Sequence, residues 1–256
     1  MKNKTRLVAL SAALALVLAA CGGNGGSGDL GLITDDVLTV CTDSPYAPME
    51  FEQDGEFTGF DIELMRAIAS ELGLSDIAVV NTGFDPITSG LAMEAGDCDI
   101  AAASITITDD REENIDFTDG YFTADQSLLV ADGAPTSLAD FSGSSLAVQT
   151  GTTGEAYANE NAPEGTEIQS FENPGDVFTA LEAGNIQGVL QDIVPNAEYA
   201  LNNDGVSLAE TFPTDETYGF ATKEEGAEAL LEAVNEALQT LRDNGTYDDI
   251  YADWFS

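Results

Sequence analysis

Residues 103–111 read ASITITDDR and follow an apolar run at 100–103 that predicts a buried strand. The residues at 108–110, a threonine and two aspartates, are typical of the cap and first turn of a helix. The sequence therefore predicts a strand-to-helix junction at which polar groups gather. Junctions of this kind are where open α/β sheets bind ligands.

Arg111 ends this polar stretch. A planar guanidinium beside the hydroxyls of Ser104 and Thr106 would hold a small carboxylate through two parallel hydrogen bonds. The alternative is an ordinary surface arginine that pairs with Glu112 or Asp116. The stretch alone leaves both interpretations open.

The N-terminus reads as a secretory leader. Three cations within residues 2–6 precede an apolar run at 7–20, which is too short to span a membrane and continue. LAAC at 18–21 resembles a bacterial lipobox, which implies cleavage before Cys21 and lipidation of its sulfur. A plain signal peptide cleaved after Ala20 is the alternative. We expect a lipoprotein signal peptide at 1–20 and, from Cys21 to residue 36, a flexible tether with a reach of roughly 20 Å.

The charge of the chain is strongly negative, at −40 for the whole sequence. The leader holds three of the seven cations and no acid, so its removal leaves four cations against 47 acids, a charge of −43. Such a charge excludes nucleic acid as a natural partner and suits a protein that is soluble in high salt. The alternative is that most acids lie on solvated helix faces without a binding role.

The remaining chain alternates strand and helix patterns, which is typical of an α/β fold. Strands at 37–41, 77–80 and 99–104, separated by helices at 60–72 and 85–95, predict parallel pairing with right-handed crossovers. A second α/β unit is expected to follow, with strands at 126–131, 145–149 and 188–191 and helices at 155–162, 176–183 and 194–201. A strand at 218–222 and a long helix at 225–243 predict that the chain returns to the first unit.

Eight motifs occur in register along this body: CTDSPYAPMEF at 41–51, GFDIEL at 59–64, GFD at 83–85, SITITDDR at 104–111, DFT at 116–118, QTGTT at 149–153, LQD at 190–192 and NGTY at 244–247. With them, residues 37–256 resemble the polar amino-acid-binding proteins of bacterial ABC importers. The resemblance implies a two-lobe periplasmic-binding-protein-like (Venus flytrap) fold with two hinge strands. It implies that 37–122 and 214–256 form lobe 1 and that 126–211 form lobe 2.

For the backbone of a bound amino acid, the resemblance gives the α-carboxylate to Arg111, with help from Ser104, Thr106 and the backbone of Thr153. It gives the α-ammonium to Asp192. The sequence agrees, because residues 150–154 form a donor-rich turn before a helix, and a carboxylate that ends a buried strand needs a cation. The alternatives are that Thr153 and Asp192 only cap the helices that follow them.

For the ligand side chain, the resemblance gives contacts from Asp43, Tyr46, Phe84 and Ala103. Tyr46 and Phe84 would sandwich an extended or planar side chain between their rings. As plain core aromatics they would have no such role.

The two cysteines that remain after lipidation, Cys41 and Cys98, lie near the ends of the first and third predicted strands. These strands are neighbours in the expected topology, and the extracytoplasmic compartment is oxidising, so we predict a disulfide. Two free buried thiols are the alternative.

We therefore expect a monomeric, lipid-anchored receptor on the extracytoplasmic face of the cell membrane, which captures a polar amino acid and presents it to an ABC permease. Asp43 favours a basic amino acid, with glutamine as the alternative. No cofactor or metal is expected. An enzyme on the same scaffold, resembling cyclohexadienyl dehydratases, is disfavoured because the chain has no histidine and no unassigned carboxylate pair at the junctions. A sensory module would need a separate partner.

Overall fold

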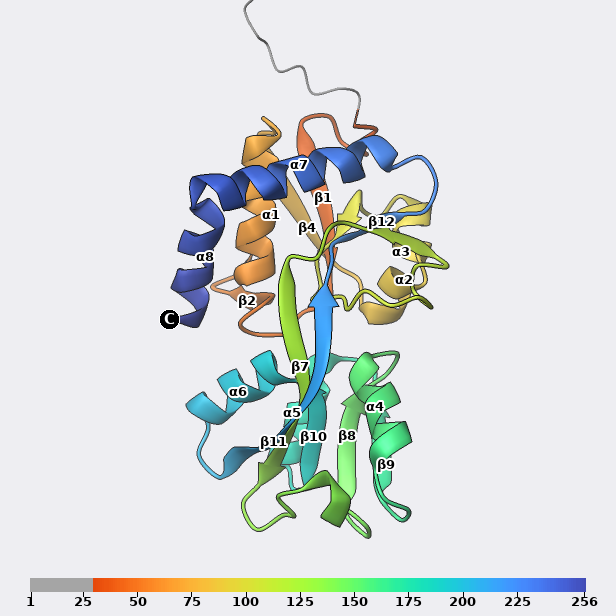
Figure 1. Cartoon of the computed structure of the whole chain (residues 1–256), viewed down its shortest axis with the longest axis vertical. Helices are drawn as coiled ribbons and strands as arrows, with labels where there is room; N and C mark the ends of the chain where they lie inside the picture. The colour runs from red at the N-terminus through yellow and green to blue at the C-terminus, as the bar shows by residue number, and fades with distance from the viewer. Residues whose placement is uncertain (1–29) are drawn as a thin grey trace, which may run out of the picture.

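The computed structural model describes residues 30–256, which form two α/β lobes joined by two long strands (Figure 1). This is the two-lobe fold that the sequence predicts. The leader, Cys21 and the first part of the expected tether lie outside the described residues.

Lobe 1 contains a five-stranded sheet in the order β4-β1-β5-β12-β6. Its strands are β1 (Val37–Thr42), β4 (Asp76–Asn81), β5 (Ile100–Ala101), β6 (Ile115–Phe117) and β12 (Ala221–Lys223). The strand β1 pairs in parallel with both β4 and β5, as the alternating pattern predicts. By contrast, β12 runs antiparallel to β5 and β6.

Helices cover both faces of this sheet, so its strands are apolar on both sides. Leu38 and Val40 of β1 face one core, which α1 (Phe60–Glu71) and α7 (Glu228–Asn244) complete. Cys41 faces the other core, which α2 (Phe84–Thr88) and α3 (Leu91–Ala95) complete. The alternation follows from the two-residue period of a strand.

Lobe 2 contains the sheet β11-β7-β10-β8-β9. Its elements are the strands β7 (Phe122–Ala131), β8 (Ser145–Gln149), β9 (Glu167–Phe171), β10 (Gly188–Asp192) and β11 (Val206–Tyr218), the helices α4 (Thr153–Asn161), α5 (Pro174–Glu182) and α6 (Ile193–Asn202), and the 3-10 turn η1 (Leu138–Asp140). Its core is also divided, because Leu128 and Leu190 face one side whereas Leu129 and Val189 face the other.

The connections between the lobes are β7 and β11, which pair with each other antiparallel and run from one lobe into the other (Figure 1). The predicted lobe boundaries, at 122–126 and 211–214, fall inside these two strands. The pairing is interrupted between Phe212 and Glu216, where β11 carries extra residues.

Two predicted elements of the junction are wrong. The helix expected after Thr108 is instead a set of turns that ends where β6 begins at Ile115. The strand expected at 99–104 is limited to β5, and the chain leaves the sheet before Ser104, which has a positive φ of 48°.

The helix expected at 85–95 is also wrong as a single element, since α2 and α3 are separated at Gly90. Gly90 has a φ of 77°, and a Cβ there would lie 2.7 Å from the carbonyl oxygen of Asn114. Only glycine fits this left-handed position without strain. The sequence also did not predict the hairpin of β2 (Phe51–Gln53) and β3 (Glu56–Thr58), the strands β6, β9 and β11, or α8 (Thr246–Phe255). The single strand expected at 218–222 is divided between the end of β11 and β12.

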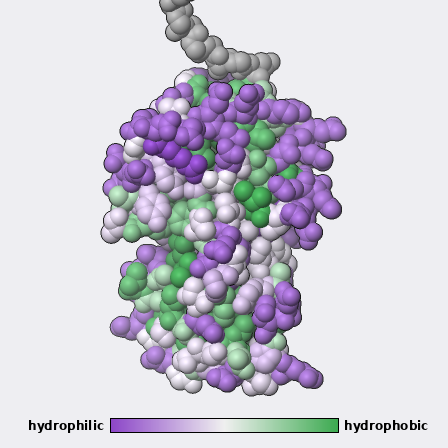
Figure 2. Space-filling model, viewed as in Figure 1, coloured by the Kyte–Doolittle hydropathy of each residue, from purple (hydrophilic) through white to green (hydrophobic). Residues whose placement is uncertain are grey.

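Cys41 and Cys98 form a disulfide in the structure, with 5.6 Å between their Cα atoms. The bond joins β1 to the residues just before β5, its parallel neighbour. On the outside of the molecule, hydrophilic side chains cover most of lobe 1 in the view of Figure 2.

Candidate functional site

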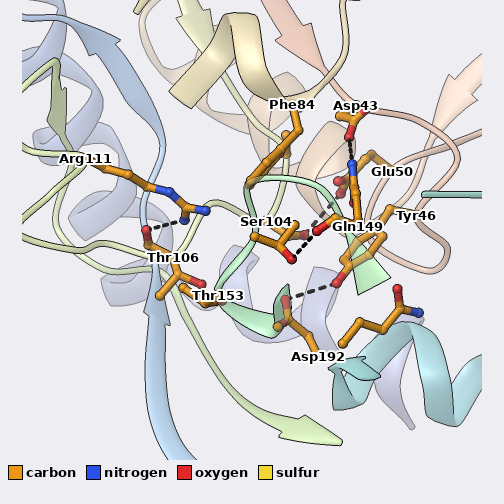
Figure 3. Close-up of a pocket in the computed structure, with 14 residues that line it drawn as sticks. Asp43, Tyr46, Glu50, Phe84, Ser104, Thr106, Arg111, Gln149, Thr153 and Asp192 are labelled. Atoms are coloured by element: carbon orange, nitrogen blue, oxygen red, sulfur yellow. Dashed lines mark hydrogen bonds between the residues drawn. The ribbon is translucent and has the colours of Figure 1, made fainter. Parts of the chain in front are cut away.

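A pocket lies between the two lobes, where polar side chains from both converge (Figure 3). All nine residues predicted from the sequence to contact a ligand line it: Asp43, Tyr46, Phe84, Ala103, Ser104, Thr106, Arg111, Thr153 and Asp192. Five lining residues were not predicted: Glu50, Gln149, Thr152, Gly154 and Gln191.

Arg111 provides the positive charge of the pocket and is only 8% exposed. Its guanidinium donates to the carbonyl oxygens of Thr106 at 2.8 Å and Gly151 at 3.1 Å, and lies 4.9 Å from the centre of the Phe84 ring. Burial lowers the pKa of the guanidinium. Its surface-pair interpretation is wrong, because Arg111 forms no ion pair within residues 30–256. Three of its five N–H donors therefore have no acceptor from that part of the chain.

Asp192 lies at the end of β10 and is the acceptor for three side chains. Oδ2 accepts from the hydroxyls of Tyr46, at 3.0 Å, and Tyr218, and Oδ1 accepts from the amide of Gln126. Burial, with a smaller contribution from Glu216, raises the pKa of Asp192 to about 6. Its side chain makes no capping bond to α6, so Asp192 does more than begin that helix.

Thr153 is the first residue of α4, and its neighbour Thr152 is the cap, since the Thr152 hydroxyl accepts from the backbone N–H of Glu155. The N-cap interpretation of Thr153 is therefore wrong. The hydroxyl of Thr153 instead donates to Glu216 at 2.6 Å.

Two further carboxylates lie on the side of the pocket away from Arg111 (Figure 3). Asp43 follows β1 and accepts from the amide of Gln149 at 2.6 Å, and burial raises its pKa to about 6. Glu50 is 1% exposed and accepts from the hydroxyl of Ser104 at 3.2 Å. Burial, with the nearby Asp61, raises the pKa of Glu50.

A further buried carboxylate, Asp61 in the first turn of α1, lies behind the residues that line the pocket. Its Oδ2 accepts from the backbone N–H of Ser104 at 2.9 Å and from the hydroxyl of Tyr121 at 2.7 Å. These bonds fix the chain at Ser104, whose left-handed backbone turns it toward the pocket. Burial raises the pKa of Asp61 to about 7.

Outside the connecting strands β7 and β11, three hydrogen bonds within residues 30–256 cross from one lobe to the other: Gln149 to Asp43, Tyr46 to Asp192, and Arg111 to the carbonyl oxygen of Gly151. The lobes are therefore closed over the pocket. A molecule inside would touch both lobes, so its release requires them to separate.

Within residues 30–256, the structure shows neither a candidate membrane span nor a candidate metal site. No helix within residues 30–256 is long and apolar enough to cross a membrane. The same residues hold no group of three or more histidine, cysteine, aspartate or glutamate side chains that suits a metal ion.

Known proteins match this chain in sequence over almost its whole length. The model of the bacterial extracellular solute-binding proteins, family 3, matches residues 38–256. The ABC transporter glutamine-binding protein GlnH of Bacillus subtilis is 33% identical over 271 residues, which covers 99% of this chain and 97% of that protein.

Two solved structures are similar in fold and sequence. One is an ancestral arginine-binding protein bound to glutamine, with a TM-score of 0.80, 34% identity, and coverage of 87% of this chain and 99% of the other. The second is AncCDT-1, an ancestral amino acid-binding protein and precursor of cyclohexadienyl dehydratase. Its TM-score is 0.78 at 36% identity, and the match covers 86% of this chain and 96% of the other.

Proposed function

Because the chain belongs to family 3 of the bacterial extracellular solute-binding proteins, we propose that it is a lipid-anchored receptor that binds a basic amino acid and delivers it to an ABC permease. It would act as a monomer on the extracytoplasmic face of the cell membrane. Relatives of the chain are amino-acid-binding proteins of ABC importers, which supports the transport role.

The two ends of an amino acid backbone find opposite charges in the pocket. Arg111 has N–H donors without an acceptor among residues 30–256, which suit the α-carboxylate, and its burial makes a charged hydrogen bond there strong. Asp192 is buried and ionisable, and its acceptor oxygens suit the α-ammonium. Because Arg111 belongs to lobe 1 and Asp192 to lobe 2, a ligand that binds both favours closure.

The observation that carries the proposal for a basic side chain is the charge balance of the pocket. Asp43, Glu50 and Asp192 face it, against the single guanidinium of Arg111. After Asp192 and Arg111 have paired with the ligand backbone, Asp43 and Glu50 remain at the far end. A second ligand carboxylate would be repelled there, whereas a guanidinium or ammonium would supply the opposite charge that stabilises both buried carboxylates.

A screen of the purified, ligand-stripped protein against the common amino acids tests this proposal directly. Thermal shift and calorimetry should give the largest stabilisation with L-arginine or L-lysine. Tightest binding of glutamate, aspartate or an aliphatic amino acid would contradict the proposed side-chain pocket. Binding of no amino acid would contradict the receptor itself.

Glutamine remains the second candidate, because the amide of Gln149 shares the far end of the pocket with Asp43. The substitution Asp43→Asn separates the two ligands. It removes a counter-charge, which should weaken L-arginine binding by about 30-fold, equivalent to about 2 kcal/mol. Asparagine still offers an amide partner, so L-glutamine binding should change little.

The proposal includes anchoring through Cys21, which rests on the LAAC sequence at 18–21. A diacylglycerol on Cys21 would hold the receptor at the membrane. Cys21→Ser should release the protein into the medium, and cell fractionation detects this. Membrane retention of the variant would contradict lipid anchoring.

Binding, not catalysis, is the proposed activity, although AncCDT-1 is a precursor of a dehydratase. A dehydratase needs a positioned acid that reaches a substrate hydroxyl. In the pocket, Asp192, Asp43 and Glu50 all accept from protein donors already, which suits them to hold cations. Incubation with prephenate should leave it unconverted, and its turnover would overturn this assignment.

A further inference from the structure

The strand β11 has an irregular segment beside the pocket, between Phe212 and Glu216. Asp215 has a positive φ of 51°, and the backbone N–H groups of Thr214 and Asp215 both donate to Oδ1 of Asp125 on β7, at 3.0 and 3.1 Å. Asp125 thus satisfies the donors that the interrupted ladder leaves unpaired. Bulges of this kind redirect the side chain that follows them, and here that side chain is Glu216.

The Glu216 carboxylate receives three hydrogen bonds, and it receives them from both lobes. Oε2 accepts from the hydroxyl of Thr106 at 2.7 Å and from the hydroxyl of Thr153 at 2.6 Å. Oε1 accepts from the amide of Gln126 at 2.8 Å. Thr106 and Thr153 line the pocket, whereas Glu216 lies outside the lining.

All three partners donate to Glu216, and a carboxylate accepts from all of them with its two oxygens. A glutamine at the position would turn its own NH₂ group toward either the two hydroxyls or the Gln126 amide. The Gln126 amide cannot reverse without loss, because it also donates to Asp192. In the orientation that keeps the Gln126 bond, the two hydroxyls would have to accept from this NH₂ group, and the charge-assisted bonds that they now donate to Glu216 would be lost.

The direction of these bonds also decides what the two hydroxyls offer to a ligand. A hydroxyl has one proton, and Thr106 and Thr153 both give theirs to Glu216. Only oxygen lone pairs remain for the pocket, and the Thr153 oxygen uses one of them to accept from the Gln126 amide at 3.3 Å. These suit a ligand ammonium better than a carboxylate, so the hydroxyl of Thr106 is poorly placed for the carboxylate contact inferred from the sequence.

We propose that Glu216 is a positioning residue that ties lobe 1 to lobe 2 through Thr106 and Thr153, and that holds both hydroxyls as acceptors for the ligand ammonium. The ammonium part rests on the proposed amino-acid-binding function. The lobe-tying part does not, because all three hydrogen bonds join side chains of the protein to one another.

The test compares Glu216→Gln with the matched control Glu210→Gln in the full-length protein. Glu210 lies on the same strand, and its carboxylate accepts from the hydroxyl of Ser137 and the backbone N–H of Leu138, both within lobe 2. Both variants remove one negative charge and disturb comparable hydrogen bonds. Only Glu216→Gln replaces charge-assisted hydrogen bonds between the lobes with weaker neutral ones.

Small-angle X-ray scattering of the unliganded proteins should give a larger radius of gyration for Glu216→Gln than for the parent and the control. In a Thr153→Val background, the same substitution should open the lobes little further, because the bond from the Thr153 hydroxyl of lobe 2 to Glu216 is already lost. Calorimetry with L-arginine should show about ten-fold weaker binding for Glu216→Gln, and less than two-fold for Glu210→Gln.

A Glu216→Gln protein that is as compact as the parent without ligand would overturn the inference, whatever its affinity. So would equal effects of Glu216→Gln and Glu210→Gln. If the parent binds no amino acid but Glu216→Gln still opens the lobes, the proposed function fails and the interlobe role of Glu216 stands.

Discussion

Arg111 is the one cation among the side chains that line the pocket, and two backbone carbonyl groups hold it in place. We expect Arg111→Ala to weaken amino-acid binding by roughly 30-fold to several thousand-fold. The reason is that removal of one partner of a desolvated charge pair costs about 2 to 5 kcal/mol. Calorimetry with L-arginine measures the effect.

The fold should survive this substitution, because Arg111 contributes to the pocket and not to a hydrophobic core. The far-ultraviolet circular dichroism spectrum of Arg111→Ala provides the control. An affinity equal to that of the parent would mean that Arg111 does not bind the ligand.

The pocket carboxylates predict that ligand affinity depends on pH. Asp43 and Asp192 have pKa values of about 6 and must be ionised to pair with a cation. Below pH 6 the ligand must displace protons, so affinity should fall by up to about ten-fold per pH unit for each carboxylate. Titrations with L-arginine at pH 7.5, 6 and 5 measure this. Constant affinity from pH 7.5 to 5 would contradict the ion pairs.

Stability of the unliganded protein should change in the opposite direction. A carboxylate whose pKa is higher in the folded than in the unfolded chain binds its proton more tightly when folded. The free energy of unfolding therefore decreases as pH rises from about 4 to about 7, the window set by Asp43, Asp192 and Asp61. The melting temperature without ligand should thus be higher at pH 5 than at pH 7.5.

Among single residues, the sequence predicted the pocket residues that stand at recognisable motif positions. It missed those whose role depends on how the folded chain places their side chains. Glu50 stands in the motif at 41–51, but only the folded chain shows its carboxylate turned inward to Ser104. Glu216 had no motif at all. Its role depends on a bulge in β11 that no local pattern in TDETY, residues 214–218, reveals.

The disulfide joins two elements of lobe 1 and closes a long loop, since Cys41 and Cys98 are 57 residues apart. In the chain-entropy model, a loop of this length stabilises the fold by about 4 kcal/mol. We expect Cys41→Ser with Cys98→Ser to lower the midpoint of denaturant unfolding accordingly, without loss of the fold.

Mass spectrometry checks the bond in the parent protein. Alkylation in denaturant without reductant should leave the mass of the body, residues 30–256, unchanged. Two added alkyl groups there would show free thiols.

Sequence patterns were sufficient to predict helices where apolar periodicity was strong, as in α1 and α7. They were insufficient where tertiary contacts determine whether a helix or strand forms. The helix α8 carries Tyr247, Tyr251 and Phe255, and it is ordered by the packing of these rings around Phe60 of α1. The 13-residue strand β11 was missed because its burial changes along its length as it passes between lobes.

The whole molecule carries an excess of acids that its cations cannot neutralise. Within residues 30–256 there is one ion pair, Arg66 with Glu63. Repulsion between the remaining carboxylates opposes the compact state and is screened by salt. We therefore expect the melting temperature to rise with salt, most steeply below about 0.1 M, where the screening length exceeds roughly 10 Å. A melting temperature that stays flat up to molar salt would contradict this.

The position of β12 in the sheet of lobe 1 determines the order in which the lobes can be completed. It lies between β5 and β6, yet it follows every strand of lobe 2 along the chain. During synthesis or export with the N-terminus first, lobe 2 has all its strands before lobe 1 receives this inner one. Until residues 221–223 arrive, β5 and β6 present unpaired edges, so an interrupted chain would hold a complete lobe 2 beside a lobe 1 exposed to aggregation and proteolysis.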